Sequence, residues 1–194
     1  MQSNYLVLAR DAVEGACSLS AMTGYADDWK LLSGIRVTGE FPSSSQFRMD
    51  PDDPNGIMLT DSLYNADMLI VASPRLRGLL EGLNIPAIEY LPVTVHNHKN
   101  RPVPESYTIV HPLDAVDCLV LDACEPRWGR IDKTDISRLK HLVIDESRID
   151  ATRVLFRPKH YKRAILVHRK LAEKIDASGC TGIRWIELAD YPER

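Results

Sequence analysis

The sequence predicts an α+β fold in which two short helices cover a mixed β-sheet. Two observations lead to this prediction. Short apolar stretches typical of strands outnumber the stretches with helical spacing. In addition, two parts of the chain repeat one order of elements at a constant offset of about 95 residues: a buried strand, a short helix, a sharp turn and a second strand. Few, short helices beside many strands indicate a sheet covered on one side.

The first of these two similar β-α-β units begins with a strand at residues 67–72. Ser73 can cap the following helix, and Pro74 stands at its first position, where each of these residue types is favoured. Pro86 prevents the helix from continuing, and residues 88–97 are expected to form the next strand. The apolar face of this helix consists of Leu76, Leu79, Leu80 and Leu83.

The second unit follows the same plan between residues 164 and 188. Its helix is expected at about 168–178, with Gly179 marking the end. Leu80 and Ile175 occupy equivalent positions in the two units, so we expect both side chains to be buried under their helices. We also expect the two units to pack as equivalent elements of one sheet. The apolar face of the second helix consists of Leu171, Ala172 and Ile175.

Further strands are expected outside the two units, and one long stretch has no clear periodicity. The strand at 106–111 should pair with 88–97 as a hairpin, because turn formers separate them. The stretch 11–56, dense in turn formers at its end, is expected to be a long loop or a poorly ordered insertion. It divides the chain into an N-terminal region, 1–56, packed on a main domain, 57–194. The remaining expected strands are 5–9, 117–121, 142–145 and 154–157.

Composition points to a cytoplasmic protein. The net charge is −3, with 24 basic and 27 acidic residues, which predicts no general affinity for nucleic acid or anionic membrane. No apolar run approaches the roughly 18 residues that a membrane span needs, and the N-terminus does not resemble a signal peptide. The four cysteines, Cys17, Cys118, Cys124 and Cys180, are scattered without a CxxC pair, as expected of free thiols in a reducing compartment.

Three histidines are the candidate metal ligands. His96 and His98 lie two residues apart on one expected strand, so they share a face, and His111 ends the hairpin partner. Three imidazoles can hold a catalytic zinc, which would suit a metal-dependent hydrolase. Against this, no carboxylate stands at a diagnostic spacing, and a one-residue slip of the hairpin would turn His111 to the other face.

Other catalytic motifs are absent from the sequence. It contains no GxSxG nucleophile context and no GxxxxGK[ST] or GxGxxG phosphate cradle. Asp145, Glu146 and Asp150 cluster beside Arg148 and Arg153. Such a cluster can serve as an acid–base pair, but a solvated loop with internal salt bridges is the favoured interpretation. We therefore expect a protein without enzymatic activity or cofactor.

Two surface features are candidates for binding a partner protein. The first is the acidic loop, Asp50, Asp52 and Asp53, which suits a basic partner, although it can also be an ordinary solvated loop. The second is the basic-aromatic patch, Arg127, Trp128 and Arg130. This patch combines residue types enriched at interface hot spots, although its tryptophan can instead anchor a loop to the core.

Several blocks of sequence carry a resemblance through their order and spacing. They are IEYLPVTV at 88–95, YTIVHPL at 107–113, LVID at 142–145, LFR at 155–157, ILV at 165–167 and TGIRW at 181–185. In this arrangement the chain resembles the immunity-protein family often called the imm-eleven family. The resemblance covers about residues 57–190, and the N-terminal quarter matches no block that we can place.

The resemblance implies a role rather than a reaction. Members of that family are predicted antidotes encoded with polymorphic bacterial toxins, including effectors of contact-dependent or type VI secretion. The family supplies no catalytic residues, and contacts with the toxin are expected on variable loops. The expected function is inhibition of a cognate toxin by protein–protein contact, with neither nucleic acid nor membrane as a partner. The alternatives are the metal-dependent hydrolase built on His96, His98 and His111, and a structural module of a larger assembly.

Overall fold

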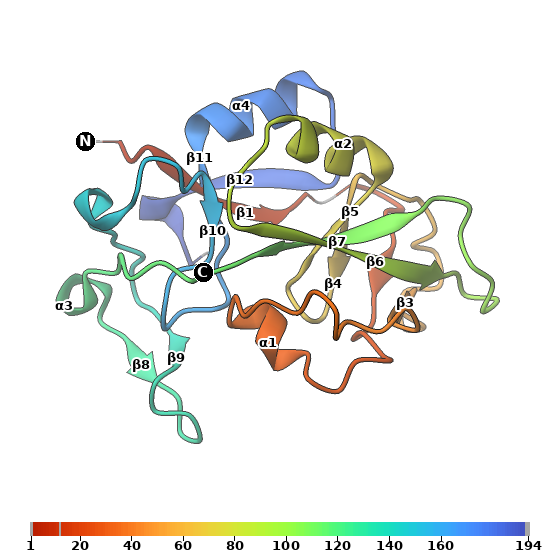
Figure 1. Ribbon diagram of the computed structural model, residues 1–194, viewed down its shortest axis with the longest axis horizontal. Coiled ribbons are helices and arrows are strands. Elements are labelled where there is room, and N and C mark those ends of the chain that lie inside the picture. The colour runs from red at the N-terminus through yellow and green to blue at the C-terminus, as the bar shows by residue number, and fades with distance from the viewer. Residues whose placement is uncertain (1, 12, 193–194) are drawn as a thin grey trace.

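The computed structural model describes residues 2–11 and 13–192, and over these residues it shows an α+β fold (Figure 1). The helices are α1 Trp29–Leu32, α2 Pro74–Gly82, α3 Leu121–Cys124 and α4 Arg169–Ala177, with short 3-10 turns η1 Glu146–Arg148 and η2 Leu188–Asp190. The strands are β1 Tyr5–Arg10, β2 Ser18–Leu19, β3 Gln46–Arg48, β4 Ser62–Asn65, β5 Ile70–Ala72, β6 Ile88–His96, β7 Tyr107–Pro112, β8 Arg127–Trp128, β9 Ile136–Arg138, β10 Leu155–Phe156, β11 Leu166–His168 and β12 Ile183–Glu187.

The strands form two larger sheets and one small hairpin. An antiparallel sheet has the order β10-β11-β1-β12, and a mixed sheet has the order β2-β4-β5-β7-β6-β3. The mixed sheet is parallel where β2 meets β4 and where β3 meets β6. Strands β8 and β9 pair only with each other and project from the molecule at the lower left of Figure 1, while α2 and α4 lie side by side at its top. None of the helices within the described ranges is both long and apolar enough to cross a membrane.

Both expected β-α-β units are present, and they keep the 95-residue offset closely. Helix α2 begins at Pro74 and α4 at Arg169, and the strands that follow begin at Ile88 and Ile183. In each unit two parallel strands flank an antiparallel strand, which is β7 in the first unit and β1 in the second. The prediction that both units share one sheet is wrong. Each unit builds its own sheet because its middle strand comes from a different part of the chain.

The two unit helices are joined by one apolar cluster that also reaches both sheets. Ser73 caps α2, its hydroxyl accepting a hydrogen bond from the Leu76 N–H at 3.3 Å. Leu80 is 2% exposed and Ile175 is 3% exposed, which confirms the burial expected from their spacing. The cluster brings these helices together with residues of both sheets: Leu6, Ile70, Ala72, Leu76, Leu80, Val110, Val167, Leu171, Ala172 and Ile175.

Two stretches that were predicted to be strands do not form strands. In residues 117–121 and 142–145 the only β contact is an isolated bridge between Leu119 and Ile144, and α3 begins at Leu121. These stretches are apolar because they line a second core cluster, in which Leu119 and Leu142 are each 3% exposed. A short apolar run without sheet neighbours cannot be distinguished from a buried strand by its composition.

The stretch 11–56 contributes elements to the fold, contrary to the long loop expected from its weak periodicity. It contains β2, α1 and β3, and the side chains of Leu31 and Phe47 are fully buried. Residues 50–56 form a loop of consecutive turns, as their composition predicts. In this loop the Asp53 N–H donates to the Asp50 carbonyl and the Gly56 N–H donates to the Asp53 carbonyl, each at 3.1 Å.

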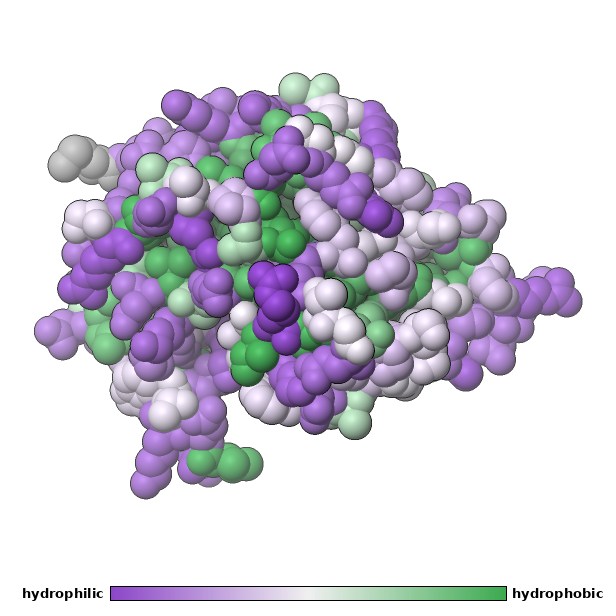
Figure 2. All heavy atoms as spheres, in the orientation of Figure 1, coloured by the Kyte–Doolittle hydropathy of each residue, from purple (hydrophilic) through white to green (hydrophobic). Residues whose placement is uncertain are grey.

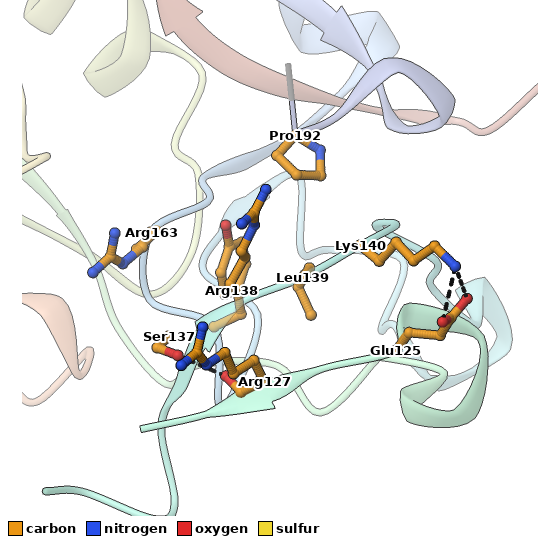
Figure 3. A pocket seen from close by; sticks show the side chains of 9 residues that line it. Glu125, Arg127, Ser137, Arg138, Leu139, Lys140, Arg163 and Pro192 are labelled. Atoms are coloured by element: carbon orange, nitrogen blue, oxygen red, sulfur yellow. Dashed lines mark hydrogen bonds and ion pairs between the residues drawn. The ribbon is translucent and has the colours of Figure 1, made fainter. Parts of the chain in front are cut away.

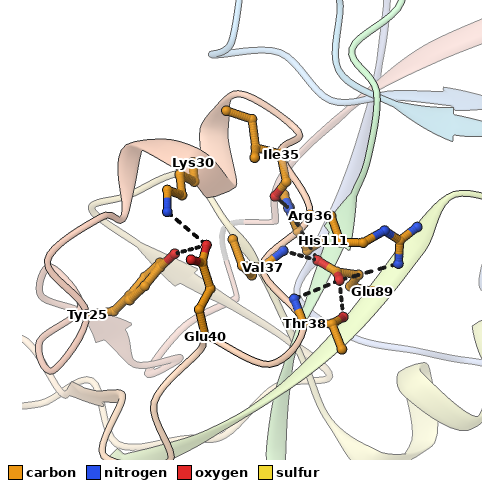
Figure 4. A network of polar contacts seen from close by, with 9 residues as sticks. All are labelled: Tyr25, Lys30, Ile35, Arg36, Val37, Thr38, Glu40, Glu89 and His111. Atoms are coloured by element: carbon orange, nitrogen blue, oxygen red, sulfur yellow. Dashed lines mark hydrogen bonds and ion pairs between the residues drawn. The ribbon is translucent and has the colours of Figure 1, made fainter.

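A buried glutamate attaches the N-terminal part of the chain to β6 (Figure 4). The Glu89 carboxylate accepts hydrogen bonds from the Val37 N–H at 2.9 Å, from the Thr38 N–H at 3.0 Å and from the Thr38 hydroxyl. The Arg36 guanidinium lies 3.5 Å from the same group. Burial acts to raise the pKa of Glu89, but these hydrogen bonds outweigh it and lower the pKa below its ordinary value. The group is therefore held ionised inside the fold.

Candidate partner-binding site

The three candidate metal ligands do not converge. The register of the β6–β7 hairpin places His111 opposite Glu89, seven residues along the strand from His96. At about 3.4 Å per residue, this separates the two histidines by roughly 24 Å. The ring of His98 lies instead 3.2 Å from the Gly56 carbonyl oxygen. The alternative of a three-histidine site is therefore excluded, because the register, which the sequence left open, places His111 and His96 at opposite ends of the hairpin.

His111 is a core residue rather than an accessible ligand. Its side chain is 1% exposed, and its Nε2 donates a hydrogen bond to the Ile35 carbonyl at 2.9 Å. Burial lowers the pKa of His111 below its ordinary value, against the hydrogen bond to Ile35 and the charge of Glu89, which raise it. Across the described parts of the chain, no group of three or more His, Cys, Asp or Glu side chains is arranged to hold a metal ion.

The acidic cluster near η1 is engaged in local contacts. Asp145 accepts hydrogen bonds from Ser147 and forms an ion pair with Arg148 at 3.1 Å. Glu146 accepts hydrogen bonds from the Ser3 hydroxyl at 2.6 Å and the Asn4 N–H at 2.9 Å, so it anchors the N-terminal strand. These contacts fit the solvated loop with internal salt bridges that the sequence favoured.

The acidic loop lies at one end of the molecule. Asp52 is exposed, and its N–H donates to the Asp50 carboxylate at 3.0 Å, so that Asp50 shapes the loop. The contact between His98 and Gly56 places this loop beside the β6–β7 connection, which forms the right-hand end of Figure 1. The loop is thus far from the β8–β9 hairpin, which projects at the left of the same view.

The basic-aromatic patch lies on the β8–β9 hairpin. Trp128 is 38% exposed, and its ring meets the His160 ring edge to face at a centroid distance of 5.8 Å. It belongs to none of the three core clusters. Arg127 and Arg130 are exposed beside it. The patch is therefore open to solvent on a projecting element.

Local sequence explains the shape of this hairpin. The Gly129 N–H donates to the Asp135 carbonyl at 2.7 Å, and a Cβ at Gly129 would lie only 2.4 Å from the Asp132 carbonyl oxygen, so the turn requires glycine. The Asp132 carboxylate accepts hydrogen bonds from the Thr134 N–H and hydroxyl at 2.8 and 2.6 Å. These bonds fix the tip as an Asx turn. Ile131 stands at the tip fully exposed, and Figure 2 shows apolar surface there.

The base of the hairpin is fixed to the core. Ile136 and Leu139 are each 1% exposed and pack in the second core cluster with Cys124 and Tyr161. The Ile136 N–H also donates to the His160 carbonyl at 2.6 Å. The hairpin is thus a projecting element on an anchored base, an arrangement that presents its side chains in fixed positions.

A basic pocket of about 550 Å³ opens beside the hairpin (Figure 3). Arg127, Arg138 and Arg163 line it over a floor that includes Leu139 and Tyr161. Figure 3 shows Arg138 extending toward Pro192. Lys140 lies beyond Leu139 in the same view and pairs with Glu125 at 2.9 Å. Among residues 2–11 and 13–192, no carboxylate lies within ion-pair distance of the three arginines. We call this feature the basic pocket.

Sequence reasoning placed only Arg127 of the basic pocket at a partner surface. Arg138, Lys140 and Arg163 were missed because the chain brings them together from separate segments. A signal was present in the run KHYKR at 159–163, which carries three basic residues. That run predicts a positively charged surface, but it does not predict that this surface lies beside the hairpin.

Comparison with known families identifies a match over nearly the whole chain. The family model described as "Immunity protein family (Imm11)" matches residues 6–190. The match includes the N-terminal quarter, which the sequence blocks had left outside the resemblance. A comparison with curated proteins gave no match.

Proposed function

Because the chain belongs to the Imm11 immunity protein family, we propose that it binds and neutralises a cognate bacterial toxin or secreted effector by protein–protein contact. Family membership carries this proposal, since the match extends from residue 6 to residue 190. In the proposal the protein acts as an inhibitor in the cytoplasm, without catalysis or a cofactor. The toxin is one delivered between bacteria by a contact-dependent or type VI route.

The arrangement of the surface supports a contact through projecting loops. The apolar faces of the two unit helices are buried in the shared core, as Leu80 and Ile175 illustrate. Specificity for one toxin is best placed on surfaces that the core leaves free. A standard interface takes about 800 Å² from each partner. Since the acidic loop and the basic-aromatic patch lie at opposite ends of the molecule, an interface of that size engages mainly one of them.

The proposal is tested by co-expression. The toxin partner is expected as the C-terminal domain of a large secreted protein encoded beside this chain. Producing that domain alone should stop growth, and producing it together with this protein should restore growth and yield a co-purifying complex. Failure to restore growth by a soluble, folded protein would contradict the immunity function.

Replacement of Trp128 with alanine is expected to weaken toxin binding by about 2 kcal/mol, roughly 30-fold, because an exposed tryptophan contributes a large contact area at an interface. The fold should stay intact, since the side chain is outside the core clusters. Calorimetric titration of the toxin domain measures the change. Trp29→Ala is the matched control, because Trp29 is 53% exposed on α1. Unchanged affinity in Trp128→Ala places the interface elsewhere, and loss of folding identifies Trp128 as a core anchor.

Neutralising the acidic loop as Asp50→Asn, Asp52→Asn and Asp53→Asn is expected mainly to slow association with a basic toxin surface. Long-range attraction acts on the association rate and is screened by salt. Asparagine keeps an acceptor for the hydrogen bond within the loop. Stopped-flow measurements at low and high salt check the prediction, and the difference from the unmodified protein should shrink at high salt. An equal rate at low salt means that the loop does not steer the toxin.

A further inference from the structure

Charge is distributed very unevenly over this protein. The chain as a whole carries 24 basic and 27 acidic residues, yet residues 125–141 and 158–163 together carry eight basic and three acidic ones. The rest of the chain therefore carries 16 basic against 24 acidic residues. The two basic segments lie together, because Ile136 bonds to His160 and the rings of Trp128 and His160 are in contact. The chain is acidic overall but has a basic pole around the β8–β9 hairpin, where Glu125 pairs with Lys140 and, from outside the two segments, Asp117 pairs with Lys159.

Two arginines of this pole face each other across the hairpin. The register of β8 and β9 pairs Arg127 directly with Arg138. Like charges on directly opposed residues destabilise an antiparallel pair. Some arginines of the protein are matched by carboxylates, as Arg77 is by Glu81 at 2.9 Å and Arg169 by Glu187 at 2.7 Å. Within the described ranges Arg127 and Arg138 have no such partner, so a ligand that brings negative charge would relieve their repulsion.

The surroundings of the basic pocket indicate the class of that ligand. Its floor includes the buried Leu139 and Tyr161, and the adjacent hairpin exposes Trp128 and Ile131. Cationic groups bordered by exposed apolar and aromatic side chains are typical of protein interfaces. A polynucleotide fits less well, because the net charge of −3 opposes the non-specific attraction on which nucleic-acid binding depends.

We propose that the basic pocket binds a carboxylate-rich segment of the partner protein, with Arg127, Arg138 and Arg163 as the groups that receive it. Guanidinium groups bind carboxylates through paired, charge-assisted hydrogen bonds. Trp128 and Ile131 supply the apolar contact at the edge. This inference rests on the proposed immunity function for the identity of the partner, and it makes the hairpin end, rather than the acidic loop, the principal contact with the toxin.

The first test uses a defined probe. Fluorescein-labelled hexaglutamate is titrated with the unmodified protein and with the triple variant Arg127→Gln, Arg138→Gln, Arg163→Gln. The unmodified protein should bind hexaglutamate at low salt and not bind hexaglutamine, and the triple variant should bind at least about ten-fold more weakly. The double variant Arg48→Gln, Arg101→Gln is the matched control, since both arginines are exposed and lie near the other end of the molecule. It should bind hexaglutamate as the unmodified protein does.

Three outcomes overturn the inference. They are no binding of hexaglutamate by the unmodified protein, equal binding by the triple variant, and tighter binding of a short single-stranded DNA than of hexaglutamate. Thermal unfolding separates a binding effect from a folding effect. Removing the opposed charges should leave the melting temperature of the triple variant unchanged or raised.

The second test uses the toxin domain and distinguishes this inference from the proposed function. If the unmodified protein neutralises the toxin and the triple variant does so with equal affinity, the basic pocket is not the contact, and the immunity function stands. If the folded, unmodified protein fails to neutralise the toxin, the proposed function is wrong, whatever the peptide result. The expected result is neutralisation by the unmodified protein and by the Arg48, Arg101 double variant, with at least about ten-fold weaker binding by the triple variant.

Discussion

Replacing Leu80 or Ile175 with alanine is expected to lower the free energy of unfolding by about 2–5 kcal/mol, the usual cost of truncating a buried leucine or isoleucine. The two side chains are 2% and 3% exposed, and both belong to the cluster that joins both sheets. Each truncation removes buried apolar surface and leaves a cavity that neighbouring helices can fill only in part. Denaturant unfolding of the purified variants measures the loss.

Two controls keep this prediction specific. Leu79→Ala removes the same side chain from a half-buried position on α2 and should cost clearly less. Leu80 and Ile175 belong to the same cluster, so the double variant should lose more stability than either single variant. Near-zero destabilisation by both single variants would contradict the arrangement of α2 and α4 over a common core.

Replacing Glu89 with alanine is expected to cost about 3 kcal/mol, because buried donors left without an acceptor cost about 1–3 kcal/mol each. The substitution leaves the N–H groups of Val37 and Thr38 without partners and releases Arg36. The same unfolding measurement applies. Glu81→Ala removes a glutamate from a surface ion pair with Arg77 and should change stability by less than about 1 kcal/mol. Similar losses for the two variants would show that Glu89 does not attach the N-terminal segment.

The same carboxylate predicts a pH dependence with a definite sign. The pKa of Glu89 is lowered from 4.5, so its stabilisation is present above that value and is lost as the pH falls through the folded-state pKa. The pKa of His111 is lowered from 6.5, so stability also declines as the pH falls below that value, because the unfolded chain binds a proton that the folded one excludes. The protein should therefore lose stability in two stages on acidification. Glu89→Ala should lose less stability in the lower stage than the unmodified protein does; the lowered pKa values of Asp61 and Glu146 keep part of that stage.

Features set by neighbouring residues could be predicted from the sequence. Helix α2 begins at Pro74, directly after the Ser73 cap, and the offset of about 95 residues predicted α4 and the strand at Ile183. Caps and periodicity act within one or two turns, so they are readable from a short stretch of chain. The same reasoning gave the β6–β7 hairpin.

Features set by distant partners could not be predicted in this way. Strand β1 pairs with β11 and β12, and its position between them decides that the second unit forms its own sheet. The hairpin register decides that His111 lies opposite Glu89 rather than near His96. The basic pocket likewise depends on β8–β9 meeting the segment that contains Arg163. Each of these outcomes depends on three-dimensional packing that local composition leaves open.

The most direct test of the immunity function is a calorimetric titration of the purified toxin domain into the purified protein, followed by assay of the toxin in the mixture. A saturable, equimolar complex with a dissociation constant on the order of nanomolar or tighter, as is typical of specific inhibitors, is the predicted result. Toxin activity should disappear at the equivalence point. A folded protein that shows no binding at micromolar concentrations and leaves the toxin fully active would contradict the proposal.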